Sequence, residues 1–322
     1  MAISAREDAG MNGALATQPG AQEFRAFWSG PPLSAYEELS LTTLVQRGQR
    51  VVLYSYDRTL RVPDGVVLAD ADEVLPGGRV REFVYPSGER SPALHSDLFR
   101  YEALRRFGGW YFDLDIVLLR DAPPAADIYI ARQDDGQVNG AVMHFPSNAP
   151  LIVAALAAAP ALLREPEWGA IGPALLTRIV REQDMTRAVR PWTAAFPVRT
   201  SETCQLFLPE HREALESRTA DADFVHLWNE IWRRVRVPKN YGPPEGSFLD
   251  SLFRRCGMRF PPEARLSAQA VASWFREDNV RLERDAMLAS TSWRITAPFR
   301  TCVHALREAA ATVRGRSGSK MD

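Results

Sequence analysis

The chain has 322 residues, of which 46% are hydrophobic and 25% are charged, and its formal net charge is −1. This composition is that of a globular protein long enough for one large α/β domain and a small accessory region, and it argues against membrane-spanning and intrinsically disordered classes. The near-zero net charge gives no general electrostatic basis for binding nucleic acid, so no nucleic-acid partner is expected.

The amino-terminal segment and the cysteines bear on the compartment. Residues 1–21 are small and polar without an apolar core, so we expect a disordered leader rather than a secretory signal or a membrane anchor. The three cysteines, Cys204, Cys256 and Cys302, lie far apart and form no CxxC pair. Neither a disulfide framework nor a thiolate metal site is predicted, and a reducing, cytoplasmic setting is expected.

The first regular elements predict the start of a parallel sheet. A strand over 23–29 is followed by a helix that opens with the capping box Ser34 to Glu37 and ends at Gly48, and then by a strand over 50–56. Ligands of open α/β sheets bind at the carboxyl ends of the strands. Trp28 lies at such an end, although filling the core is an equally good interpretation of this residue.

The segment 91–115 carries most of the functional signal. Ser91 and Pro92 open a predicted helix that ends at Gly108, and a strand ending in Asp113 and Asp115 follows. On a strand these two aspartates share one face with Tyr111, whereas Trp110 and Phe112 point to the other. Two carboxylates side by side favour a divalent cation. Asp97 and Arg100 share a face of the preceding helix, where a surface salt bridge is the alternative interpretation.

The downstream sequence predicts further alternating elements. Strands are expected over 127–131 and 137–145, a helix over 148–163, and a second helix that begins at Pro173 after Gly172. Residues 223–229 read as a short strand that turns into a helix. This last segment contains His226, and a lone histidine of this kind is more often structural than a metal ligand.

The last segment has an amphipathic, basic pattern. Phe299, Val303 and Leu306 follow helical spacing, and arginines recur every seven residues along the flank of this helix. Such a helix suits an anionic membrane surface, which predicts peripheral membrane contact through residues 291–316. A helix that docks on the protein's own core is the equally weighted alternative.

The order of motifs in residues 96–115 resembles that of the glycosyltransferases with the DxD sugar-binding region. The elements that carry the resemblance are Ser96-Asp97, Arg100-Tyr101, Gly108-Gly109, Trp110-Tyr111 and Asp113-Leu114-Asp115. That family includes the initiating α-1,6-mannosyltransferase and the α-1,4-galactosyl and N-acetylglucosaminyl transferases. The resemblance implies a GT-A-like single domain over 22–278, with a mainly parallel central sheet flanked by helices, and a helical tail over 279–322.

The resemblance also implies an activity. It is metal-dependent, retaining transfer of a hexose or N-acetylhexosamine from a nucleotide sugar, with UDP favoured over GDP, to a glycan or lipid-linked acceptor. The expected setting is bacterial surface polysaccharide or glycolipid synthesis, in the cytoplasm or on the inner face of the plasma membrane. In such enzymes the proton of the acceptor passes to the donor's own phosphate, so no protein base is assigned.

The resemblance assigns roles to individual residues. Asp113 and Asp115 are the expected catalytic residues, and together with His226 they are the expected ligands of Mn²⁺ or Mg²⁺. The expected donor contacts are Trp28, Asp97, Arg100, Tyr101, Tyr111 and Asn139. The residues expected near the acceptor or donor sugar are Gly172, Pro173, Thr177, Trp228 and Asn229.

Two other functions compete with this one. A haloacid-dehalogenase-type phosphatase shares the strand that ends in Asp113 and Asp115, but its later lysine and acidic pair occur here in the wrong order. A non-catalytic protein that binds nucleotide sugars within a polysaccharide assembly complex is the second alternative. The intact Asp-x-Asp disfavours it, because loss of the metal carboxylates is the easiest route to such a role.

Overall fold

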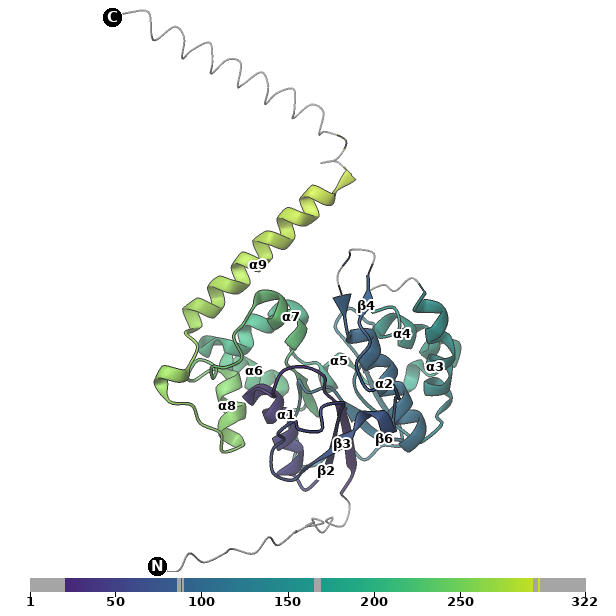
Figure 1. Ribbon diagram of the computed structural model, residues 1–322. Helices are drawn as coiled ribbons and strands as arrows, with labels where there is room; N and C mark the ends of the chain where they lie inside the picture. The colour runs from purple at the N-terminus through teal and green to yellow at the C-terminus, as the bar shows by residue number, and fades with distance from the viewer. Residues whose placement is uncertain (1–20, 86–87, 89, 165–168, 292–294, 296–322) are drawn as a thin grey trace, which may run out of the picture.

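The computed structural model describes residues 21–85, 88, 90–164, 169–291 and 295 (Figure 1). Nearly all of the expected leader, residues 1–21, and most of the expected amphipathic segment, residues 291–316, lie outside this part of the chain. None of the described helices combines the length and the apolar character needed to cross a bilayer.

A six-stranded sheet forms the centre of the fold, in the order β3-β2-β1-β6-β9-β8. Strands β1, β2, β3 and β6 run parallel, whereas β9 is antiparallel to both of its neighbours. The expected mainly parallel sheet is therefore confirmed. The bounds are Glu23–Phe27 (β1), Arg50–Ser55 (β2), Val66–Asp70 (β3), Gly109–Phe112 (β6), Tyr129–Arg132 (β8) and Val138–Phe145 (β9).

Helices cover both faces of this sheet, which confirms the expected α/β class. Three helices lie together on one side in Figure 1, and α1 lies on the other. The three helices are α2 (Ala93–Phe107), α3 (Pro150–Leu162) and α4 (Pro173–Glu182), and α1 spans Ala35–Val45. The predicted capping box is present, because Ser34 accepts from the first turn of α1 and Glu37 accepts from the Ser34 amide.

The alternation predicted for the central strand is confirmed over β6. Tyr111 packs in the hydrophobic cluster beneath α2, whereas Trp110 and Phe112 pack in the cluster on the opposite face. Trp110 stacks on Phe24 of the neighbouring strand, with ring centroids 5.0 Å apart. The strand is buried on both faces, as a central parallel strand must be.

The prediction that β6 continues through both aspartates is wrong. The Asp113 amide still donates to the carbonyl of Ala141 on β9 at 2.7 Å, but the Ile116 amide then donates to the Asp113 carbonyl at 3.0 Å and closes a turn. A second strand, β7 (Ile116–Leu118), begins after this turn. Asp113 and Asp115 are therefore the first and third residues of a turn rather than neighbours on one strand face.

The bounds of α2 differ slightly from the prediction. Pro92 is the amino-terminal cap residue instead of the first helical residue, and Ser91 accepts a bond from the Ala93 amide at 3.2 Å. Gly108 ends the helix as predicted, with φ +61°. A side chain there would meet the Ser147 amide at 2.5 Å, so this tight passage from helix to strand requires glycine.

A small antiparallel ladder joins the carboxyl-terminal half of the chain to the DxD turn. Strand β10 (Phe224–His226) pairs with β7 so that His226 stands opposite Ile116. The segment was predicted as a strand that turns into a helix, and α7 (Asn229–Val235) follows it. This ladder brings His226 next to the residue after the DxD turn.

The remaining elements form a helical layer beside the sheet. It is held by a cluster that includes Tyr36 of α1, Phe207 and Trp232. The other helices are α5 (Trp192–Ala195), α6 (Arg212–Thr219), α8 (Phe248–Arg255) and α9 (Ala268–Ala289), with the 3-10 helix η3 over Thr200–Phe207.

A two-stranded hairpin pairs β4 (Phe83–Val84) with β5 (Arg90–Ser91).

Helix α9 extends away from the body of the molecule (Figure 1). Val271, Phe275 and Asp278 are its buried residues, and every residue from 279 to 289 is exposed. Residues 278 and 279, between which a domain boundary is expected from the sequence, both lie inside the continuous helix α9.

Candidate functional site

The site begins with a buried arginine between two aspartates. Arg100 on α2 donates from Nη1 to Asp97 Oδ1 at 2.5 Å, and from Nη2 to both carboxylate oxygens of Asp113 at 2.7 Å. The Arg100 guanidinium also lies over the ring of Tyr111, 5.2 Å from its centroid. The predicted pair of Asp97 and Arg100 is therefore not a surface salt bridge, because Arg100 is only 6% exposed.

The electrostatics of this group follow from its removal from water. Burial raises the pKa of Asp97 and of Asp113, and the positive charge of Arg100 only partly offsets this effect. Asp113 is the more accessible of the two carboxylates, with 31% of its side chain exposed. Asp113 is therefore a partly exposed carboxylate whose orientation is fixed by the buried Arg100.

The second aspartate of the motif faces a different set of partners. Asp115 Oδ2 lies 3.1 Å from His226 Nε2 and accepts the Asn229 amide at 2.9 Å. Burial by itself would raise the pKa of Asp115, but the charge of His226 and the hydrogen bonds from His226 and Asn229 hold that pKa below its usual value. This carboxylate is therefore kept ionised.

The backbone at Trp228 is in an unusual conformation. Trp228 has φ +60° and ψ +50°, a left-handed region that bulky residues rarely adopt. Its indole donates to the Val198 carbonyl at 2.8 Å, and its ring centroid lies 4.0 Å from that of His226. This turn aims the Asn229 amide at Asp115, and strain of this kind is common at functional sites.

The side chains of Asp115 and His226 are spaced as ligands of a divalent cation are. Asp115 Oδ2 and His226 Nε2 are 3.1 Å apart, close to the ~3.0 Å between two atoms at right angles on a cation with bonds of about 2.1 Å. The buried His226 Nδ1 and Asn229 Oδ1 have no hydrogen-bond partner. A carboxylate, an imidazole and an amide oxygen are suitable ligands for Mn²⁺.

The three expected metal ligands are not all brought together. Asp115 and His226 are in contact, whereas Asp113 faces Arg100. Within the described part of the chain, no group of three or more acidic, histidine or cysteine side chains is arranged to hold a metal. The residues present therefore fit a cation at Asp115 and His226, with Asp113 beside it.

Two glycines allow close packing around the buried arginine. A Cβ at Gly140 on β9 would lie 3.0 Å from Arg100 Nη1, and one at Gly172 would lie 3.2 Å from Asp97 Oδ2. Gly172, expected near the sugar, is therefore placed directly against Asp97. Gly140 was not singled out from the sequence, because only the tertiary packing shows what it approaches.

Thr177, expected near the sugar, and Asn139, expected to contact the donor, hold the backbone around the site. The Thr177 hydroxyl donates to the Pro173 carbonyl at 2.7 Å and accepts the Val138 amide at 2.8 Å. Asn139 Oδ1 accepts the Ala141 amide at 2.7 Å, which shapes β9 next to Gly140. These contacts tie the start of α4 to the strand beside the DxD turn.

The two tyrosines expected to contact the donor lie in the core. Tyr101 and Tyr111 are 0% and 1% exposed, and the Tyr101 hydroxyl donates to the Ile171 carbonyl at 2.6 Å. That bond fixes the loop that carries Gly172. Their position favours support of Arg100 and Gly172 over direct contact with a ligand.

Trp28 lines a cavity of about 490 Å³. Because β1 and β6 are parallel neighbours in register, Trp28 and Asp113 leave the sheet at the same edge. The Trp28 indole donates to the Pro31 carbonyl at 2.9 Å. The cavity is also lined by Pro32, Leu33, Ser34, Ala35, Glu37, Lys239, Asn240 and Phe260.

Glu37 connects this cavity to the DxD turn. Its Oε1 accepts the Asn229 side-chain amide at 3.1 Å and the Lys239 ammonium. The sequence signals Glu37 only as part of a capping box. Its second role was missed because these partners lie 192 and 202 residues further along the chain.

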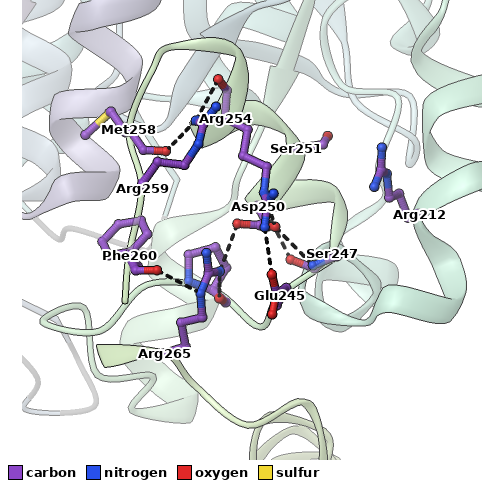
Figure 2. Close-up of polar contacts among 12 residues, drawn as sticks. Arg212, Glu245, Ser247, Asp250, Ser251, Arg254, Met258, Arg259, Phe260 and Arg265 are labelled. Carbon is purple, nitrogen blue, oxygen red and sulfur yellow. Dashed lines mark hydrogen bonds and ion pairs between the residues drawn. The ribbon is translucent and has the colours of Figure 1, made fainter. Parts of the chain in front are cut away.

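A buried carboxylate anchors the arginine that contacts Phe260, one of the cavity-lining residues (Figure 2). Asp250 on α8 accepts from Arg265 Nη1 and Arg254 Nε, both at 2.8 Å. Arg265 also donates to the carbonyls of Phe260 at 3.1 Å and Pro243 at 3.0 Å. This network holds the loop with Phe260 against the segment that follows Lys239.

Two stretches of the chain match known protein families. Residues 84–133 match the family model described as "Glycosyltransferase sugar-binding region containing DXD motif", and residues 144–244 match "Alpha 1,4-glycosyltransferase conserved region". The first segment holds Asp97, Arg100 and the DxD, and the second holds His226 and Lys239.

Two further comparisons concern whole chains. A search of curated protein sequences found no match. Among solved structures, the chain is similar to one titled "PaToxG Glycosyltransferase", with 15% identity and a TM-score of 0.38. That similarity covers 50% of this chain and 68% of the other.

Proposed function

We propose that this chain transfers a hexose or N-acetylhexosamine from a nucleotide sugar. The premise is that it is a glycosyltransferase with a DXD sugar-binding region and an α-1,4-glycosyltransferase conserved region. UDP is the favoured nucleotide, and configuration at the anomeric carbon is retained. The observation that carries the proposal is the array of Asp97, the buried Arg100 and Asp113, which stands beside Asp115 at one edge of the sheet.

The donor spans the site from the cavity to the DxD turn. The nucleobase stacks on Trp28, a contact worth roughly 1–3 kcal/mol by analogy with other base–aromatic pairs. The sugar lies at Asp97 and Asp113, whose oxygens accept hydrogen bonds from its hydroxyls. Arg100 keeps both carboxylates oriented, so the sugar meets acceptors that are already in place.

Asp115 and His226, with Asp113 beside them, are the residues that would hold Mn²⁺ or Mg²⁺. When bound, the cation supplies Lewis-acid assistance to the departing nucleoside diphosphate. Asp115 is suited to this role because its neighbours keep it ionised. No side chain is assigned as a general base, in keeping with retention of configuration.

The acceptor is proposed to be a glycan or a lipid-linked glycan of bacterial surface polysaccharide or glycolipid synthesis. A lipid-linked acceptor fits the basic heptad of Arg300, Arg307 and Arg314 in the sequence, which suits an anionic membrane surface. The proposed place of action is the cytoplasm, or the inner face of the plasma membrane by peripheral contact.

The test is a panel of UDP- and GDP-sugars incubated with Mn²⁺, with and without acceptors. We expect release of nucleoside diphosphate from one donor, and a fall of at least about a hundredfold in Asp113→Ala and Asp115→Ala. The control is Asp221→Ala, a fully exposed aspartate outside the site. Donor binding without turnover with any acceptor would instead favour the scaffold alternative. NMR of the product reports the anomeric configuration.

A further inference from the structure

Glu37 is buried more deeply than its capping role requires. In a capping box the third helical residue only needs to reach back to the cap amide, and glutamine does this as well as glutamate. Glu37 is 1% exposed, and burial of a carboxylate is costly unless its charge is matched. Ser34 uses one carboxylate oxygen, and the other oxygen is directed to Asn229 and Lys239.

The bond to Asn229 ties Glu37 to the DxD turn. Asn229 donates its side-chain amide to Glu37 at 3.1 Å and its backbone amide to Asp115 at 2.9 Å. Glu37 thereby fixes the first residue of α7, immediately after the strained Trp228. Displacement of Glu37 would be felt at Asp115 through this single intermediate residue.

The bond to Lys239 places a cation on the wall of the cavity. Lys239 and Trp28 both line the cavity, and 27% of the Lys239 side chain is exposed. An ammonium has three N–H donors, and Glu37 takes one of them.

We propose that Lys239 binds the diphosphate of the donor, and that Glu37 is the positioning residue that aims Lys239 and holds Asn229. This inference rests on the proposed function, in which the nucleobase lies at Trp28 and the sugar at Asp113. The diphosphate joins those two parts, so it must lie between them. Lys239 is on the line of contacts that connects the cavity to Asp115.

The experiment compares binding of nucleoside diphosphates with binding of the matching nucleosides. Calorimetry with UDP and uridine, and with GDP and guanosine, is done in Mn²⁺ on the full chain. The parent protein should bind one diphosphate more tightly than its nucleoside. Lys239→Met should weaken the binding of that diphosphate by about tenfold or more, which is the size expected for a charged hydrogen bond. The affinity for the nucleoside should be unchanged.

Glu37→Gln tests the positioning role, because glutamine keeps the capping box and the side-chain shape. We expect weaker diphosphate binding and unchanged nucleoside binding. In the Lys239→Met background (the Glu37→Gln/Lys239→Met double variant) the Glu37→Gln change should weaken diphosphate binding less than it does in the parent, because Glu37 then has no ammonium to aim and only its bond to Asn229 is lost. The control is Glu230→Gln on the exposed side of α7, which breaks an ordinary ion pair with Arg233.

The double variant also separates function from stability. Removal of Lys239 alone leaves the Glu37 charge without its cation, whereas the double variant removes both charges and should recover the thermal unfolding midpoint of the parent. Recovered stability with weak diphosphate binding supports the proposal. Equal diphosphate binding by the parent and Lys239→Met would overturn it and leave the proposed function standing. A parent chain that binds no nucleotide would overturn both.

Discussion

Arg100 holds both carboxylate oxygens of Asp113 at 2.7 Å from one guanidinium nitrogen, while its other terminal nitrogen holds Asp97. Only a planar fork of fixed donors can serve two carboxylates in this way. The arrangement makes the first aspartate of the DxD and the helix before it one rigid unit. Its orientation therefore depends on the shape of the arginine side chain as well as on its charge.

The first prediction is that Arg100→Lys lowers the kcat/KM of donor turnover by about 10- to 100-fold. Lysine keeps the charge but cannot bridge Asp97 and Asp113, so one charged hydrogen bond worth about 1.5–3 kcal/mol is lost. Steady-state kinetics on the active donor measures this. Arg105→Lys, at a half-exposed pair with Glu102 on the same helix, is the control. Equal kinetics of both variants would show that charge alone suffices at Arg100.

The second prediction concerns the glycines packed against this unit. Gly140→Ala should reduce kcat/KM by roughly tenfold, because its Cβ would stand 3.0 Å from Arg100 Nη1 and 3.1 Å from Leu176 Cδ1. Gly172→Ala should act in the same direction through Asp97, at 3.2 Å. Kinetics and thermal unfolding are measured on the same samples. Parent-like kinetics in a folded Gly140→Ala protein would contradict this account.

The third prediction is a selective effect on metal use. EDTA should abolish donor turnover and Mn²⁺ should restore it. In Asp115→Asn and His226→Gln the Mn²⁺ concentration for half-maximal activity should rise by about 10- to 100-fold, a range typical of altered metal sites. Asp135→Asn, in an exposed turn, is the control. If both site variants keep the Mn²⁺ dependence of the parent, the cation does not lie at Asp115 and His226.

The fourth prediction is a loss of stability as the pH falls from about 6.5 towards 4. His95 is buried, accepts the Arg81 amide at Nδ1, and contacts the Tyr56 hydroxyl through Nε2. Burial, followed by the charge of Arg81, lowers the pKa of His95 to about 4. The unfolded chain, with its ordinary histidine pKa of about 6.5, binds a proton in this window while the folded protein does not.

The stabilising effect of neutral His95 is therefore complete above pH 6.5 and declines below it. Thermal unfolding between pH 7.5 and 4 should show a falling midpoint, with a flatter curve in His95→Gln. Burial also shifts the pKa of Asp97, Asp113 and His144, so the difference between the two curves is the test. Parallel curves would exclude His95 as a source of the slope.

The fifth prediction concerns the carboxyl-terminal segment. Deletion of residues 291–322 should abolish sedimentation with vesicles that contain anionic lipid, and should leave turnover of a water-soluble acceptor unchanged. The matched control replaces Arg300, Arg307 and Arg314 with glutamine in the full chain, which removes the charge but keeps the length. Undiminished sedimentation of the deletion variant would rule out this segment as the anchor.

Local signals predicted much of the fold. The strands β1, β2 and β9 and the helices α1 and α3 followed from apolar runs with clear caps or breakers. Strand β3 was missed although Val66 to Asp70 contain a short apolar run, and the structure shows it as a partly exposed strand at the edge of the sheet. The turn after Phe112 was also missed, since alternation continues across Asp113 and nothing nearby in the sequence breaks it.

The contacts of the candidate site likewise include some that the sequence predicted and some that it did not. The contacts of Asp97 and Arg100 with the DxD lie within twenty residues, so helix and strand periodicity placed them near one another. The Glu37–Lys239 pair and the approach of Gly140 to Arg100 depend on how distant elements pack. Propensity and spacing carry no information on such contacts, and only the assembled sheet and helices reveal them.

The β7–β10 ladder sets an order for the assembly of the site. The sixth strand of the main sheet ends at Phe145, whereas Asp115 meets His226 across a separation of 111 residues. In a chain synthesised from its amino terminus, the main sheet emerges well before β10. An interrupted chain thus lacks the imidazole and the amide that hold Asp115, so these contacts form only when translation has passed the second strand of that ladder.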